Sequence, residues 1–156
     1  DFVRPGLLLY GLVPPPLGST LPLTPVMSLT SRVVAVKGVR VGETIGYGGR
    51  FTAERPVTLA VIPAGYADGL DRRLEGRGAV LIRGRRAPLV GAVSMDMLTA
   101  DVTDIDAVGP GDEVVFLGSQ GSEPQQTIDA REMAAWIGTI PYEILCRLGS
   151  RVERKY

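Results

Sequence analysis

GYGGRFTAERPVTLAVIPAGYADG, residues 46–69, is the stretch that decides the fold class of this chain. Its centre, residues 57–62, is β-branched and aliphatic and lies between two prolines, which is typical of a buried strand. Tyr47 and Tyr66 lie on either side of this segment, each directly after a glycine. Because glycine permits backbone angles that other residues avoid, each Gly-Tyr pair can hold its phenol away from the core and direct it into a cleft.

Short segments on both sides of this stretch are also expected to be strands. These segments, separated by turns that contain glycine, are residues 7–13, 26–41, 79–82, 86–93, 98–102 and 113–117. The alternation of apolar and polar residues in 31–41 predicts one strand, or two strands that meet at Gly38, with one face in water. Gly84 is expected to form the turn of a hairpin. The pattern predicts a mainly β fold, either a barrel or a sandwich.

A helical pattern is confined to the C-terminal part of the chain. Thr127 is expected to be the N-cap of one helix, and Gly138 is expected to end it. A second short helix is expected to have Pro141 in its first turn and to stop at Gly149. Residues 151–156 are expected to form a last strand or a frayed tail.

Proline content places a boundary near the N-terminus. Residues 14–25 hold five prolines, which excludes a helix or a central strand and predicts an extended linker. We therefore expect residues 1–13 and residues 26–156 to belong to different domains. The chain begins with Asp rather than Met, so we expect that it was processed or cut from something longer. It has no apolar run of membrane-spanning length and no signal segment, and a cytoplasmic location is expected.

Composition excludes several kinds of site. The 156 residues contain no histidine, so a histidine base, an imidazole metal ligand and a Ser-His-Asp triad are impossible within the chain. A single cysteine, Cys146, excludes an internal disulfide or a cysteine cluster for zinc. The formal net charge is zero and the arginines are scattered, which argues against nucleic-acid binding. The groups left for proton transfer are tyrosines, carboxylates and the only two lysines, Lys37 and Lys155.

Six segments together resemble alanine racemase, the pyridoxal-phosphate enzyme of bacterial cell-wall (peptidoglycan) metabolism. They are RPGLLLYG (4–11), TIGYGGRFTA (44–53), IPAGYADG (62–69), APLVGAVSMDM (87–97), VGPGDEVVFLG (108–118) and TIPYEILC (139–146). They occur in the family's order and span almost the whole chain. The resemblance implies that residues 26–156 are the family's C-terminal domain, β-barrel-like with a short helical segment near the C-terminus. It implies that residues 1–13 are the last strand of a preceding (β/α)₈ barrel that this chain otherwise lacks.

The resemblance also implies an activity for the full-length protein, the interconversion of L- and D-alanine by a lysine and a tyrosine on opposite faces of Cα. In the family, the lysine lies on the barrel and holds pyridoxal phosphate as a Schiff base. Lys37 and Lys155 have no pocket-like context, so this fragment alone is expected to be inactive. Tyr47 matches the tyrosine base, which the family supplies to the partner subunit's active site, so a homodimer is implied.

Residues near both ends of the chain match the family's cofactor contacts. Arg4 matches the arginine that faces the pyridine nitrogen. Because arginine donates hydrogen bonds and stays charged, it would leave that nitrogen unprotonated and weaken the ring as an electron sink. Gly6 and Leu7 match backbone donors to the cofactor phosphate, and Tyr142 matches a tyrosine whose hydroxyl contacts the same phosphate.

Substrate contacts are implied for the middle of the chain. Met95 matches a residue whose backbone N–H meets the substrate carboxylate across the dimer. Tyr66, Arg72 and Asp96 match residues of the channel through which the substrate enters. Ala92 stands where many relatives have arginine, which leaves the detail of that channel and the breadth of substrates open.

Without the resemblance, these residues have ordinary structural interpretations. Tyr47 would be a tyrosine that caps a turn, Arg4 a surface arginine and Met95 a core methionine. The alternatives for function are a racemase for another small amino acid such as serine, the decarboxylase branch of the same architecture, and a β-barrel that binds a protein or small ligand without catalysis. The missing pocket lysine and the neutral charge are compatible with the last of these.

Overall fold

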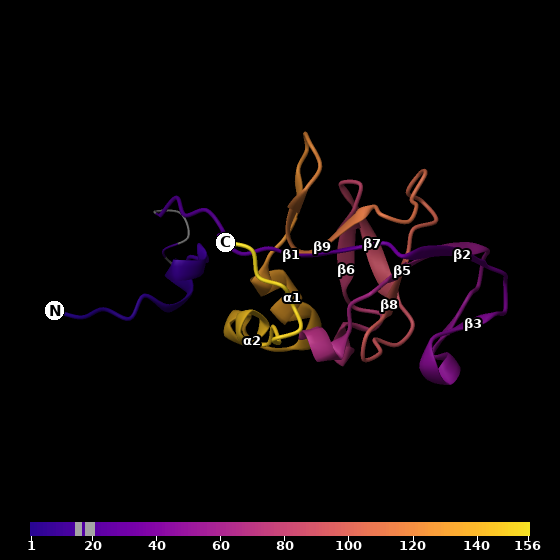
Figure 1. The fold of residues 1–156 in the computed structure, drawn as a ribbon, viewed down its shortest axis with the longest axis horizontal. Coiled ribbons are helices and arrows are strands. Elements are labelled where there is room, and N and C mark those ends of the chain that lie inside the picture. The colour runs from indigo at the N-terminus through magenta and orange to yellow at the C-terminus, as the bar shows by residue number, and fades with distance from the viewer. Residues whose placement is uncertain (15–16, 18–20) are drawn as a thin grey trace.

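An antiparallel sheet forms the body of the computed structural model, which describes residues 1–14, 17 and 21–156 (Figure 1). Its strands are β1 (Leu29–Arg32), β2 (Ala35–Val39), β3 (Thr44–Ile45), β4 (Phe51–Thr52), β5 (Val57–Ile62), β6 (Ala79–Ile82), β7 (Arg85–Val90), β8 (Leu98–Asp101), β9 (Glu113–Gln120) and β10 (Gln126–Ile128). Short 3₁₀ helices are η1 (Gly6–Tyr10), η3 (Tyr47–Gly49), η4 (Tyr66–Asp68) and η5 (Arg72–Leu74), and the α-helices are α1 (Ala130–Ile137) and α2 (Pro141–Cys146).

One bent segment of the chain forms both edges of the main sheet. The strand order is β1-β9-β6-β7-β8-β5-β2, with antiparallel neighbours, and β10 pairs with β9. Val33 donates to the carbonyl of Asp112, whereas the next residue, Val34, donates to the carbonyl of Val61, both at 2.9 Å. The pairing partner therefore switches between these two residues. Because residues 29–39 reach both edges, the sheet must curve around its core, as expected of a mainly β, barrel-like domain.

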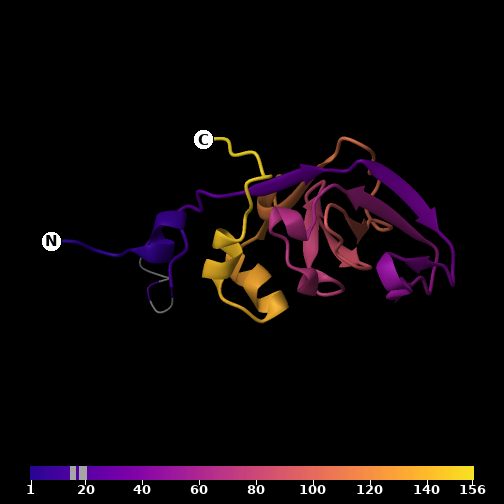
Figure 2. The same cartoon turned by 60° about the horizontal axis from the view of Figure 1, so that its bottom comes forward.

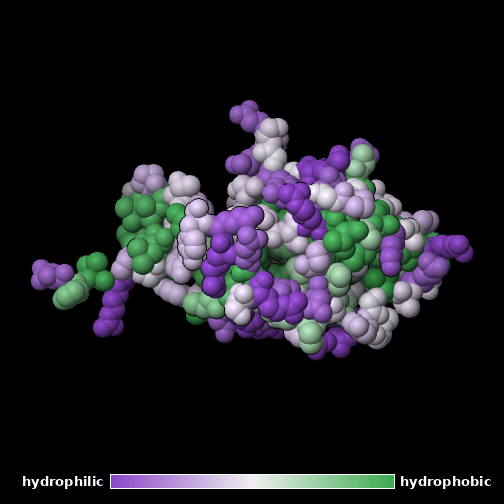
Figure 3. Space-filling view, viewed as in Figure 1, coloured by the Kyte–Doolittle hydropathy of each residue, from purple (hydrophilic) through white to green (hydrophobic). Residues whose placement is uncertain are grey.

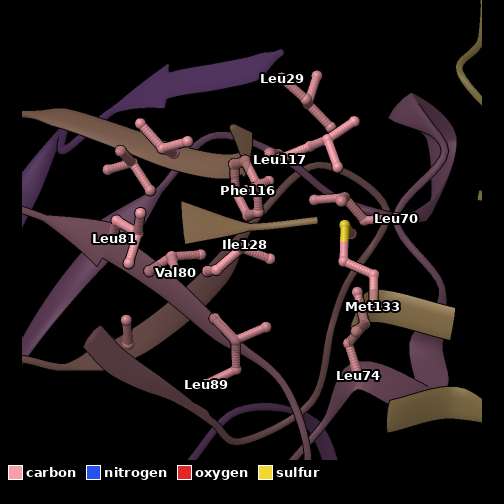
Figure 4. Close-up of a cluster of buried hydrophobic side chains, with 14 of the residues drawn as sticks. Leu29, Leu70, Leu74, Val80, Leu81, Leu89, Phe116, Leu117, Ile128 and Met133 are labelled. Atoms are coloured by element: carbon pink, nitrogen blue, oxygen red, sulfur yellow. The ribbon is translucent and has the colours of Figure 1, made fainter. Parts of the chain in front are cut away.

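The core lies inside the curved sheet and continues under the helices. Figure 4 shows Val80, Leu81 and Phe116 from the strands, together with Leu74 of η5 and Met133 of α1, directed into one cluster. These side chains are almost completely buried. Burial of apolar surface is the main favourable term in folding, so this cluster holds the helices to the sheet and fixes the loops between them.

Several sequence predictions are confirmed. β5 matches the predicted strand at residues 57–62, and Gly84, at φ 72°, lies in the turn between β6 and β7. α2 begins with Pro141 in its first turn, and Gly138 ends α1 in the left-handed conformation. Within the described ranges, no helix is long and apolar enough to cross a membrane.

The predicted strand at residues 7–13 is wrong. The structure has the 3₁₀ helix η1 there, closed by Gly11 at φ 72°. The apolar run consists mainly of leucines, which have no strong preference for strands, and a lone segment needs a neighbouring strand to complete its hydrogen bonds. Leu7 and Leu12 still join the core, so the apolar character of the run reports burial rather than strand structure. Assignment of residues 1–13 to a separate barrel stays a prediction.

Three boundaries also differ from the prediction. Thr127 is not an N-cap but lies in β10, and Asp129 caps α1 by accepting two backbone N–H groups at 2.8 and 2.9 Å. The break in the predicted strand 26–41 comes at Val33 and Val34 instead of Gly38, because the change of pairing partner occurs there. The second helix ends at Cys146 instead of Gly149, whereas residues 151–156 form a tail, which is one of the two predicted alternatives. Part of the predicted linker, residues 15–16 and 18–20, lies outside the described residues.

Candidate active site

Tyr47 is presented on a tight loop between β3 and β4. Gly46 precedes it at φ 75°, and a Cβ atom on Gly46 would lie 2.9 Å from the backbone nitrogen of Ala92. Glycine is needed at this position because both the backbone angle and the close approach exclude a side chain. A small apolar cluster that includes Ile45 and Val90 supports the loop from below. The Tyr47 side chain itself is 78% exposed, and its hydroxyl has no hydrogen-bond partner in the part of the chain that the structure describes.

The loop at residues 91–97, called here the central loop, connects the predicted substrate residues. Its first part contacts Gly46 beside Tyr47. Its middle accepts two backbone hydrogen bonds from the second tyrosine loop, Tyr66 N–H to the Ser94 carbonyl at 3.0 Å and Ala67 N–H to the Met95 carbonyl at 3.1 Å. The structure therefore brings the loops of all three predicted residues, Tyr47, Tyr66 and Met95, onto one connected surface.

Gly65 makes the contact between these loops possible. A Cβ atom at this position would lie 2.3 Å from the carbonyl oxygens of both Ser94 and Met95, a separation that no side chain tolerates. The Asp68 carboxylate accepts the Gly65 N–H at 2.9 Å and so closes the Tyr66 turn. Met95 is about half exposed, so part of this residue is accessible from outside this chain.

Asp96, predicted at the entrance channel, lies in an ion-pair network with the C-terminal tail. Its carboxylate accepts from Arg151 at 2.8 Å, and the same guanidinium lies 3.3 Å from the carboxylate of Asp68. The hydrogen bond to Asp96, together with the negative charge of both carboxylates, raises the pKa of Arg151 above its ordinary value. Sequence reasoning missed Arg151 and Asp68.

Arg72, a further predicted entrance residue, lies outside the ion-pair network of Asp96. It lines an open hollow of about 420 Å³ together with Arg50, Arg73, Glu75 and Arg77. Arg50 follows the Tyr47 loop and forms an ion pair with Glu75 at 3.5 Å. The hollow therefore lies between the Tyr47 loop and η5, and its lining is mainly basic.

The residues predicted to contact the cofactor phosphate come from both ends of the sequence and lie close together in space. Gly6 has φ 57°, and a Cβ atom there would lie 3.0 Å from the hydroxyl oxygen of Tyr142 on α2. In η1, the first backbone hydrogen bond is donated by the Leu8 N–H to the Pro5 carbonyl. The N–H groups of Gly6 and Leu7 come before this bond and therefore have no partner within the helix. Tyr142 is half exposed. These groups form one cluster of three donors.

Arg4 lies outside that cluster in the extended N-terminal segment and is exposed. Both lysines are exposed. Lys37 lies on β2 and Lys155 lies in the C-terminal tail. The described part of the chain contains no group of three or more acidic, cysteine or histidine side chains that could hold a metal ion.

The Tyr47 loop and the Gly6–Tyr142 cluster lie at opposite ends of the long axis. In Figures 1 and 2, η1 and α2 lie toward the N-terminal end of the view, whereas β3 and the helical turn that follows it lie at the far end. Tyr47 and Tyr142 therefore cannot contact the same small molecule within one chain. A site that uses both groups needs two copies of the chain.

Comparison with known proteins identifies the family to which this chain belongs. The family description "Alanine racemase, C-terminal domain" matches residues 26–156. Curated alanine racemases of Sorangium cellulosum and Geobacter sulfurreducens are 48% and 46% identical over the whole chain, which covers 41% of each of them.

Solved structures of the same family superpose closely. The biosynthetic alanine racemase of Pseudomonas aeruginosa has a TM-score of 0.84 and 39% identity, with 97% of this chain and 41% of that chain covered. The alanine racemase of Bartonella henselae with covalently bound pyridoxal phosphate has a TM-score of 0.87 and 36% identity, covering 97% and 40%. This chain thus spans about two fifths of the length of its relatives, and it belongs to the family of alanine racemase C-terminal domains.

Proposed function

We propose that this chain is the C-terminal part of a pyridoxal-phosphate-dependent alanine racemase that supplies D-alanine for peptidoglycan, and that it works as a homodimer. In that dimer, Tyr47 of one subunit acts in the active site of the other. The observation that carries the proposal is the separation of Tyr47 from the Gly6–Tyr142 cluster at opposite ends of one chain. A symmetric dimer brings opposite ends of two copies together and makes two equivalent sites.

The residues near η1 fit the phosphate of pyridoxal phosphate. Phosphate binds well to backbone N–H groups at the start of a helical turn, and the Tyr142 hydroxyl adds a further donor beside Gly6. Arg4 would face the pyridine nitrogen as a donor that stays charged. When bound, the cofactor supplies an electron sink for the negative charge that develops at Cα of an amino acid. The lysine that holds it would come from the preceding part of the full-length protein.

Tyr47 would move the proton on one face of Cα. Tyr47 is largely exposed on a tight turn in a single chain, so a partner subunit can cover it without unfolding the loop. As a general acid–base it must be activated by donors or cations that lie around it in the dimer. The arginines of the neighbouring hollow, Arg50 and Arg72, place positive charge on the same surface.

Met95 would orient the substrate. Its backbone N–H lies on the central loop, which is held against the Tyr66 turn by two backbone hydrogen bonds. A donor fixed in this way can meet a carboxylate without reorganisation. Tyr66 and Arg72 would then line the channel through which the substrate enters.

Apolar surface near the N-terminus supports a missing preceding domain. Figure 3 shows apolar atoms gathered over the N-terminal segment, where Leu9 and Tyr10 are exposed at 68% and 41%. Exposed apolar patches of this kind mark interaction surfaces. The barrel expected before residue 14 would cover it.

We expect the 156-residue chain alone to form no stoichiometric covalent adduct with pyridoxal phosphate and to show no racemase activity. The physical reason is that both lysines are exposed: Lys37 lies on β2, and Lys155 lies in the tail at the edge of open hollows. The measurement is incubation with cofactor, reduction with borohydride and peptide mapping, beside the full-length protein as the positive control.

The full-length protein should give one adduct at a lysine outside these 156 residues and should racemise alanine faster than serine. A single stoichiometric adduct at Lys37 or Lys155, or a full-length protein that racemises no amino acid, would refute the proposed function.

A further inference from the structure

We propose that Arg151 is a positioning residue for the racemase reaction: it fixes the spacing between the Tyr66 turn and the central loop, and so the place of the Met95 N–H. This inference rests on the proposed function for its effect on catalysis. Its structural part, the coupling of two loops by one guanidinium, stands on the geometry alone.

Arg151 joins one carboxylate from each loop. Asp68 follows Tyr66 by two residues, and Asp96 directly follows Met95. The guanidinium donates to Asp96 at 2.8 Å through one terminal nitrogen, and its Nε lies 3.3 Å from Asp68. Arginine suits this place because its planar group presents several donors in fixed directions, whereas a lysine presents one compact charge.

The tail that carries Arg151 is itself anchored to the same turn. A Cβ atom on Gly69 would lie 2.6 Å from the carbonyl oxygen of Arg147, and one on Gly149 would lie 3.2 Å from the carbonyl oxygen of Ala67. Val152, directly after Arg151, packs against the hydrophobic core. The backbone on both sides of Arg151 is therefore held by contacts, and these contacts position the Arg151 side chain.

The two ends of the network differ in exposure and in the number of their contacts. Asp68 is only 19% exposed and is held by the Gly65 N–H, whereas Asp96 is 52% exposed. Among the described residues, Arg151 provides the side-chain contact that holds the Asp96 carboxylate. Loss of Arg151 should therefore release the central loop at Asp96 more than it disturbs the Tyr66 turn.

This release predicts a specific kinetic pattern. A donor to the substrate carboxylate acts in the ground state and in the transition state alike, so its displacement raises KM more than it lowers kcat. For Arg151→Met in the full-length enzyme, we expect KM for alanine to rise about three- to tenfold in both directions, with kcat changed less than about threefold. Arg151→Lys should recover part of the loss.

Arg83→Met is the matched control. Arg83 is exposed to a similar extent, 47% against 52%, and pairs with Asp112 at 2.9 Å. It lies in the turn between β6 and β7, away from both loops. This variant loses an equivalent ion pair and should keep KM and kcat.

A second readout separates this inference from the proposed function. Hydrogen–deuterium exchange in full-length protein should show faster exchange at Tyr66 and Ala67, whose N–H groups bond to the central loop, in Arg151→Met but not in Arg83→Met. Faster exchange in Arg151→Met, combined with a wild-type protein that lacks racemase activity, would uphold the coupling and refute the function. Unchanged exchange, or an unchanged KM in an active enzyme, would overturn the role of Arg151. If Arg151→Met fails to fold, the same kinetic and hydrogen–deuterium exchange measurements on Arg151→Lys test the role of Arg151.

Discussion

Tyr47→Phe in the full-length protein is expected to lower kcat/KM in both directions by about a hundredfold to ten-thousandfold, the usual effect of losing a positioned general acid–base. The substitution keeps the ring and removes only the oxygen that exchanges the proton. The equilibrium between two enantiomers is fixed, so the forward and reverse efficiencies must fall together. A circular-dichroism assay started from each enantiomer measures both.

Proton exchange with solvent should become one-sided in the same variant. The enantiomer whose α-proton faces the lysine can still lose and regain that proton without inversion. In deuterated water, this enantiomer should gain deuterium with retained configuration, whereas the other should stay nearly unlabelled. Proton NMR of the recovered amino acid measures the label at Cα.

Tyr66→Phe is the control, because Tyr66 also lies on a glycine-supported turn beside the central loop. We expect it to change the apparent substrate affinity more than the exchange. Equal exchange of both enantiomers in Tyr47→Phe, or one-sided exchange in Tyr66→Phe, would show that the catalytic phenol is not Tyr47.

Gly65→Ala should be the most damaging small substitution near the site. The added methyl group would lie 2.3 Å from two carbonyl oxygens, so the Tyr66 turn and the central loop must separate. Overpacking and the loss of two backbone hydrogen bonds together should cost about 2–5 kcal/mol of unfolding free energy. Displacement of Met95 and Tyr66 should lower kcat/KM by about a hundredfold.

Gly38→Ala is the matched control for that substitution. Gly38 lies in β2 with no heavy atom within 4 Å of the added methyl group and without a left-handed backbone angle. Urea unfolding and alanine racemisation should both stay close to wild type. If Gly65→Ala behaves like Gly38→Ala, the contact between the two loops does not matter for stability or catalysis.

The sequence predicted those features that depend on local pattern. β5 and the hairpin turn at Gly84 follow from a β-branched run and a glycine with a positive φ. The end of α1 at Gly138 follows in the same way. The predicted strand at residues 7–13 was wrong because an apolar run indicates burial and does not by itself select a strand. Leu7 is buried, but it lies in the 3₁₀ helix η1.

The candidate site was only partly predictable, because its contacts join distant parts of the chain. The resemblance named Tyr47, Met95 and Tyr142, but only the fold places the loops of the first two in contact and puts the element that carries Tyr142 far from the Tyr47 loop. Arg151 pairs with Asp96 across 55 positions of sequence, and no local pattern marks an arginine in a tail for that role.

Activity of mixed dimers tests the central claim most directly. One full-length variant carries Tyr47→Phe, and a second lacks the lysine that holds the cofactor, as identified by the adduct mapping. Each homodimer should be nearly inactive. If Tyr47 serves the partner's site, each mixed dimer contains one site with both groups intact.

Random mixing should therefore restore about a quarter of wild-type activity, since half of the dimers are mixed and each has one of two sites intact. Co-purification of differently tagged subunits of the two variants after mixing provides the control for exchange of subunits. Restoration near this level is the result that we predict. Mixed dimers that remain as inactive as the two parent variants would contradict a site shared between subunits and would place Tyr47 outside the partner's chemistry.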